Sequence, residues 1–157
     1  MATTFKALLE RQITVDATPS VVWGIVRDVR RMPEWSPQVV SVKMRDPDGD
    51  IRLGSAFTNL NRQDELEWIT HGEVVRYVPG EEIAFRIAEN YTIWSFAISP
   101  YGDDGTVLTQ RRETPDGISQ LSLELTESHL GGQQAFTELL EAGMERTLSA
   151  VKACAES

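Results

Sequence analysis

Hydrophobic and polar positions alternate along seven separate segments of this chain, which is typical of β-strands with one buried face. Residues that favour turns end several of these segments, such as Pro47 with Gly49 and Pro79 with Gly80. The connections are short, and short connections join neighbouring strands that run antiparallel. The pattern therefore predicts one strand followed by a six-stranded antiparallel meander, with strands at 11–16, 39–44, 55–61, 66–78, 83–88, 91–99 and 106–113.

Two other segments have the hydrophobic spacing of amphipathic helices. Thr18 supplies a capping hydroxyl group and Pro19 follows at the first helical position, so a helix is predicted over 19–29. A pair of glycines precedes a longer apolar stripe, which predicts a second helix over 133–153.

Two further segments are less regular. The two prolines within 32–37 allow at most one short helical turn there. The segment 118–127 is ambiguous, because its leucines alternate as in a strand while its composition suits a helix. We favour a helix for this segment.

The lengths of these elements predict an internal cavity. The helix over 133–153 would be roughly 32 Å long at about 1.5 Å per residue, whereas the strand over 66–78 would extend for about 43 Å. The sheet must therefore curl around the helix, and a single helix cannot fill the concave side at the density of a protein interior. Gly143 lies within the apolar stripe, where it either widens this cavity or allows a close contact with another element.

The composition excludes several classes of function. The 157 residues include 15 Lys and Arg against 24 Asp and Glu, a net charge of −9 that disfavours binding to nucleic acid or to an anionic membrane. The single cysteine, Cys154, excludes an internal disulfide and cysteine-based metal clusters, and we expect no cofactor. No apolar run is long enough for a signal peptide or a stable membrane insertion, so we expect a cytoplasmic protein.

Several motifs spread over nearly the whole chain follow the pattern of a known superfamily. They include Ala17-Thr18-Pro19-Ser20-Val21-Val22-Trp23, Met32-Pro33-Glu34-Trp35-Ser36-Pro37, Gly54-Ser55-Ala56-Phe57, Pro79-Gly80-Glu81 and Gly143-Met144-Glu145-Arg146-Thr147-Leu148. With the order of the elements, these motifs resemble the START/polyketide cyclase-like superfamily (SRPBCC), whose helix-grip fold is also that of the birch pollen allergen.

The resemblance is fairly specific for the fold and poorly specific for the activity. It implies a single α+β domain over residues 1–157, in which a seven-stranded curved antiparallel sheet wraps around a long C-terminal helix, with two short helices after the first strand. Members of the superfamily include lipid binders, polyketide aromatase/cyclases, quinone-binding chaperones and ribosome-directed toxins.

Strand alternation, combined with the family pattern, predicts the wall of the cavity. If Phe57 points inward, as its place in the family pattern implies, residues at even spacing along each strand share one face. A one-residue bulge would invert this assignment. The resulting wall is mostly apolar and aromatic, as in many small-molecule sites. The predicted ligand-binding residues are Phe57, Asn59, Asn61, Trp68, Thr70, Val74, Phe85, Trp94, Phe96, Leu108, Gln110 and Arg112 from the strands, and Phe136, Leu140, Gly143 and Met144 from the last helix.

This predicted wall has few groups that transfer protons. Gln110 does not titrate, and Arg112 stabilises an enolate better than it removes a proton. His71 and Glu73 have the opposite parity from Trp68, so we expect both side chains on the convex, solvent-exposed face. We therefore assign no catalytic residue from the sequence.

These observations favour the binding of a hydrophobic small molecule, such as a lipid, an isoprenoid or a polyketide-like compound. One alternative is an enzyme like the polyketide cyclases and dehydrases, in which Arg112, Gln110 and Asn61 position the substrate. A further alternative is a protein-binding module of the toxin or antitoxin type. The sequence leaves the choice between a monomer and a homodimer open.

Overall fold

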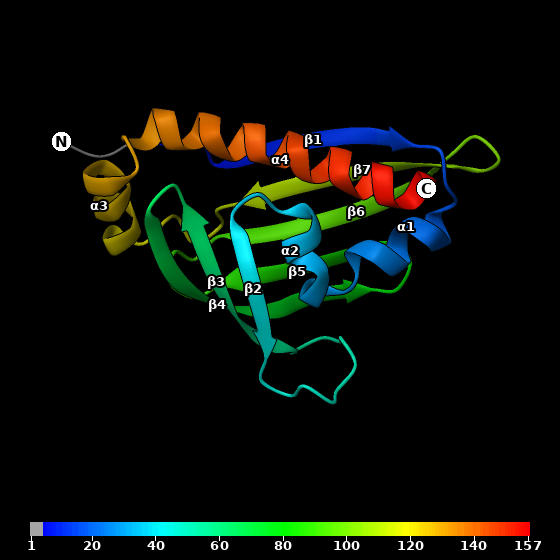
Figure 1. The fold of residues 1–157 in the computed structure, drawn as a ribbon, viewed down its shortest axis with the longest axis horizontal. Coiled ribbons are helices and arrows are strands. Elements are labelled where there is room, and N and C mark those ends of the chain that lie inside the picture. Colours follow the sequence, from blue (N-terminus) through cyan, green and yellow to red (C-terminus); the bar gives the residue numbers. More distant parts are fainter. Residues whose placement is uncertain (1–4) are drawn as a thin grey trace.

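A curved antiparallel sheet with a long helix across its concave side dominates the structure (Figure 1). The structure is a computed structural model and describes residues 5–157. The sheet has seven strands in the order β1-β7-β6-β5-β4-β3-β2, so the predicted meander is confirmed and the first strand pairs with the last. The strands are β1 (Leu8–Val15), β2 (Val39–Met44), β3 (Ala56–Gln63), β4 (Leu66–Val78), β5 (Glu82–Ile87), β6 (Ile93–Tyr101) and β7 (Gly105–Glu113).

The helices complete the predicted helix-grip fold. The long helix α4 runs over the β1 side of the sheet, α1 and α2 lie near its C-terminal half, and α3 lies beside its N-terminal end (Figure 1). The helix that we favoured near 118–127 is confirmed as α3. The helical segments are α1 (Pro19–Val26), the 3-10 turn η1 (Val29–Arg31), α2 (Met32–Trp35), α3 (Gln120–His129) and α4 (Gln133–Glu156).

The first helix is shorter than the sequence predicts. Thr18 caps α1 by accepting a hydrogen bond from the backbone of Val21, as expected. However, α1 ends at Val26, because the extended backbone of Asp28 interrupts the helix and its side chain caps the following turn. Val29 is still buried. The apolar face that the hydrophobic spacing over 19–29 indicated is therefore preserved although the helix is interrupted.

A bulge in β4 changes which side chains face inward at the end of that strand. The register with β5 shifts between Val74 and Arg76, so that Tyr77 lies opposite the buried Ile83. Strand alternation alone would have placed Arg76 on the inner face. The bulge follows Val74, so the alternation along the preceding part of β4 is retained.

The interior is divided into a packed part and an open part along α4. The C-terminal half of α4 contributes Leu148 and Val151 to the main hydrophobic core. Val22 of α1 and Leu108 of β7 belong to the same core and are completely buried. The N-terminal half contributes Phe136 and Leu140, which border a cavity instead.

Candidate ligand-binding site

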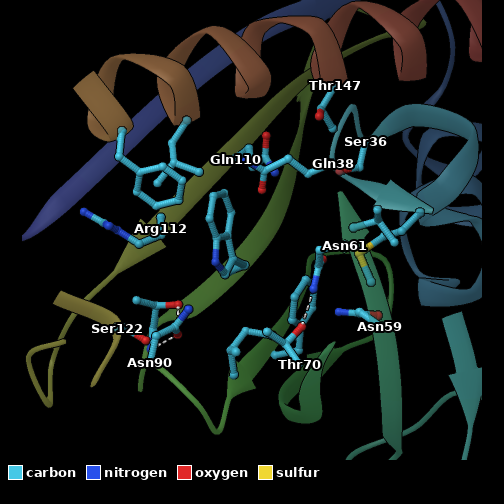
Figure 2. A pocket seen from close by; sticks show the side chains of 18 of the residues that line it. Ser36, Gln38, Asn59, Asn61, Thr70, Asn90, Gln110, Arg112, Ser122 and Thr147 are labelled. Atoms are coloured by element: carbon cyan, nitrogen blue, oxygen red, sulfur yellow. Dashed lines mark hydrogen bonds between the residues drawn. The ribbon is translucent and has the colours of Figure 1, made fainter. Parts of the chain in front are cut away.

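A cavity of about 160 Å³ lies between the concave face of the sheet and the N-terminal half of α4 (Figure 2). Its wall comes from the six strands β2 to β7, from the α2 region and from helices α3 and α4. The lining residues are Met32, Trp35, Ser36, Gln38, Val39, Asn59, Asn61, Trp68, Thr70, Phe85, Ile87, Asn90, Thr92, Trp94, Phe96, Gln110, Arg112, Ile118, Ser122, Thr126, Gln133, Phe136, Thr137, Leu140 and Thr147.

The strand rows that alternation predicted face this cavity. Asn59 lies opposite Thr70 across β3 and β4, and residues directly opposite in antiparallel strands point to the same side of a sheet. In the same way Trp94 lies opposite Arg112 across β6 and β7. The predicted residues that line the cavity are Asn59, Asn61, Trp68, Thr70, Phe85, Trp94, Phe96, Gln110, Arg112, Phe136 and Leu140.

Three predicted strand residues face inward but do not line the cavity. Val74 and Leu108 are completely buried in the main hydrophobic core, where side chains from other elements fill the space. Phe57 occupies the space above Gly72, and a Cβ atom added to that glycine would lie 2.4 Å from the Phe57 ring. The ring also packs edge-on against Phe85.

Two predicted helix residues also lie outside the cavity lining. Met144 is buried with Leu9 and Leu140 in a second hydrophobic cluster. A Cβ atom added to Gly143 would lie 3.4 Å from Cγ of Pro37, so this glycine allows a close contact with the segment after α2 and does not widen the cavity. Of the two interpretations of Gly143, close contact is therefore the one that the structure supports.

Apart from Phe136 and Leu140, the cavity residues that come from helices and loops were missed by sequence reasoning. Trp35 of α2 was not among the predicted ligand-binding residues, yet its ring lines the cavity and packs edge-on against Phe96. Thr137 and Thr147 also line it. These threonines interrupt the apolar stripe of α4, and such polar interruptions of a buried stripe are the signal that could have identified them.

Helix α3 is fixed beside the cavity through the turn between β5 and β6. The Ser119 hydroxyl group caps α3 and also donates a hydrogen bond of 2.6 Å to the Glu89 carbonyl oxygen. The Ser122 hydroxyl group donates to the same oxygen at 3.2 Å. In that turn, the Asn90 side chain accepts hydrogen bonds from the Thr92 backbone and hydroxyl group. These contacts fix the polar side chains of Asn90 and Ser122 on the α3 side of the cavity wall.

Four buried polar atoms on the cavity wall have no hydrogen-bond partner among the described residues. They are Nε1 of Trp35, Oδ1 of Asn59, Oε1 of Gln110 and Nε of Arg112. A buried donor or acceptor without a partner costs about 1–3 kcal/mol. In contrast, the Asn61 amide donates to Oγ1 of Thr70 at 3.0 Å and to the Trp68 carbonyl oxygen.

Arg112 is the one ionisable side chain among the residues that line the cavity. It is 4% exposed, and its Nη2 atom donates to the Lys6 carbonyl oxygen at 2.5 Å. Burial lowers the pKa of Arg112, and attraction to Glu141 opposes that shift only in part. A guanidinium group nevertheless stays protonated near neutral pH. The cavity thus contains one fixed positive charge.

The wall lacks the groups that general acid–base catalysis uses. Its described lining contains no Asp, Glu, His, Lys, Cys or Tyr side chain. His71 is exposed on the convex face, as predicted, and its Nδ1 atom lies 2.6 Å from Glu89. Glu73 is exposed too. The one charged group of this lining, the Arg112 guanidinium, is of a kind that stabilises an anion or an enolate.

Two further features are absent from residues 5–157. No group of three or more His, Cys, Asp or Glu side chains is placed to hold a metal ion there. None of the described helices is long and apolar enough to cross a membrane.

Solved structures with the same fold are similar to this chain at low sequence identity. The di-domain ARO/CYC StfQ from the steffimycin biosynthetic pathway is 19% identical, with a TM-score of 0.73 over 96% of this chain, which spans 50% of StfQ. The Zhui aromatase/cyclase from Streptomyces sp. R1128 is 17% identical, with a TM-score of 0.68 over 95% of this chain and 93% of that protein. Major latex-like protein 151 from Panax ginseng is 12% identical, with a TM-score of 0.69 over 96% and 97% of the two chains.

The family of this chain is established by its sequence as a whole. No curated protein sequence matches it significantly. The model of one protein family, described as polyketide cyclase / dehydrase and lipid transport, matches residues 6–156. This match covers nearly the entire sequence and agrees with the fold and with the cavity, and the chain therefore belongs to the polyketide cyclase / dehydrase and lipid transport family.

Proposed function

We propose that this protein binds a small, largely apolar molecule in the cavity between its sheet and the N-terminal half of α4. The observation that carries this proposal is a cavity wall that combines large apolar and aromatic side chains with polar ones, four of which have a buried polar atom without a partner among the described residues. Binding sites for small molecules combine such a wall with a few polar groups that fix the orientation of the ligand.

The size of the cavity limits what it encloses. An apolar cavity of about 150 Å³ holds a molecule the size of benzene, and this cavity has a volume of about 160 Å³. The enclosed part of the ligand is therefore compact, with one ring or two fused rings rather than an extended acyl chain.

Filling the cavity from α4 should abolish binding. Leu140 lines the cavity, so the variant Leu140→Trp should reduce the affinity for a compact aromatic ligand at least tenfold, because the indole ring would occupy the ligand's space. Isothermal titration with 2-naphthoate, an aromatic acid, and with 2-naphthol, an uncharged aromatic alcohol, provides the measurement.

Glu138→Trp is the matched control, since Glu138 is exposed on the same helix and does not line the cavity. A thermal melt of each variant verifies that it is folded. Unchanged affinity in a folded Leu140→Trp protein would show that the ligand binds elsewhere.

The second candidate function is ring closure of a polyketide-like substrate. It is favoured by Arg112, whose buried guanidinium group could stabilise an enolate, and by the likeness in fold to the two aromatase/cyclases. The absence of an acid or base from the described lining favours simple binding over this function.

Measuring product formation from a poly-β-ketone mimic tests this second function. In an enzyme of this kind, Arg112→Ala should lower the rate at least a hundredfold, because removal of one oxyanion-stabilising group typically costs about 100–1,000-fold. A wild-type rate equal to that of buffer, or an unchanged rate in the variant, would exclude this role for Arg112.

A further inference from the structure

The position of Arg112 gives the cavity a charged end and an uncharged end. Arg112 lies between Leu9 of β1 and Trp94 of β6, its direct neighbours on the adjacent strands. Figure 2 shows Arg112 on one side of the cavity, with Asn59 and Asn61 on the other. A ligand that spans the cavity therefore meets a cation at one end and amide groups at the other.

The charge of Arg112 is not neutralised by any ion pair in the described part of the chain. No carboxylate oxygen there lies within 4.0 Å of its guanidinium group. Glu141 is the acidic group that influences it, but Glu141 binds Arg11 at 2.8 Å and Lys6 at 3.4 Å. Lys6 and Arg11 thus already compensate the negative charge of Glu141.

An uncompensated buried cation is costly. Among the described residues, the guanidinium group of Arg112 donates to one backbone carbonyl oxygen, and its buried Nε has no partner. Buried charges are normally paired, because desolvation of an ion costs several kcal/mol. An anionic group placed in the cavity would remove this cost and would satisfy the orphan Nε–H.

We propose that the ligand of this cavity is a compact ring carboxylic acid whose carboxylate group binds Arg112. This inference rests on the proposed function and specifies its ligand class. The carboxylate accepts from the N–H groups of Arg112 that the Lys6 carbonyl oxygen leaves free, among them that of Nε. The ring lies among the aromatic side chains of the wall, and a hydroxyl group at its far end donates to Oδ1 of Asn59 and accepts from Nε1 of Trp35.

Comparing 2-naphthoate with 2-naphthamide tests this inference, because the two probes share their shape and differ in charge. Isothermal titration of the wild-type protein at pH 7 should show the carboxylate binding at least tenfold more tightly than the amide. In Arg112→Gln this preference should fall below threefold, while the affinity for the amide is retained. Arg112→Lys should keep part of the preference, because lysine supplies the charge without the guanidinium geometry.

Arg111→Gln is the matched control. Arg111 is the neighbouring residue on β7, but its side chain lies on the opposite face and pairs with Glu10 at 2.5 Å. Its removal changes the net charge by the same amount and should leave the preference for the carboxylate intact. A loss of preference in this control would attribute the effect to overall charge and contradict the role of Arg112.

The outcomes separate this inference from the proposed function. Equal affinity of the wild-type protein for both probes overturns the anionic ligand but supports the cavity as a binding site. A preference that persists in Arg112→Gln also overturns the role of Arg112. Binding of neither probe contradicts both proposals. If Arg112→Gln fails to fold in a thermal melt, the wild-type comparison and Arg112→Lys still decide the question.

Discussion

Replacing Leu148 with alanine should lower the free energy of unfolding by about 3 kcal/mol, within the roughly 2–5 kcal/mol typical of buried leucines. Leu148 is 2% exposed and belongs to the main hydrophobic core, which also contains residues of α1 and of the sheet. Its removal leaves a cavity where α4 is held against the sheet, and tightly packed surroundings cannot collapse to fill it. Urea denaturation monitored by circular dichroism provides the measurement.

Ser149→Ala is the matched control for this substitution. Ser149 is exposed on the next position of α4, so its truncation should change the free energy of unfolding by less than about 0.5 kcal/mol. A loss below about 1 kcal/mol in Leu148→Ala would contradict the assignment of the C-terminal half of α4 to the packed core.

Truncation of Trp35 should destabilise the protein by roughly 3–5 kcal/mol, the usual range for a buried aromatic side chain replaced by alanine. Trp35 is 5% exposed, and its ring meets Phe96 edge-on with ring centroids 5.3 Å apart. The same ring lines the ligand cavity. Trp35→Ala should therefore enlarge the cavity and weaken the packing of α2 against the sheet, as measured by urea denaturation.

Trp35→Phe separates packing from hydrogen bonding at this position. Phenylalanine keeps an aromatic ring against Phe96 and removes the buried Nε1–H that has no partner, so the stability loss should be under about 1.5 kcal/mol. The preference for 6-hydroxy-2-naphthoate over 2-naphthoate should fall by roughly threefold to tenfold, the equivalent of one net hydrogen bond. A Phe variant as unstable as the Ala variant would contradict this separation.

The boundaries of β2 and β4 could be predicted from the sequence to the residue, at 39–44 and 66–78. Both strands alternate clearly and end at turn residues, and alternation is a local property of the chain. The same property, combined with the family resemblance that implies an inward Phe57, predicted that Asn59, Gln110 and Arg112 face inward, and all are buried.

A local side-chain cap, a bulge and a contact between distant parts of the chain decided the features that were predicted wrongly or missed. The side chain of Asp28 ends α1 early by capping a new turn, although the apolar spacing continues to Val29. The bulge in β4 reverses the facing of its last residues after Val74. Gly143 lies against Pro37, more than one hundred residues away in the sequence, and no periodicity connects the two.

The sequence by itself determined the order of the elements and the curvature of the sheet around one helix, because these follow from local periodicity and length. The resemblance to the family added which face of β3 to β7 points inward, apart from the end of β4 after its bulge. Only the tertiary structure decided where the interior stays open. Val74 and Thr70 share one face of β4, yet the core fills the space beside Val74 while Thr70 borders the cavity. That difference depends on which distant side chains reach each position, as does the lack of a partner for Nε of Arg112 among the described residues.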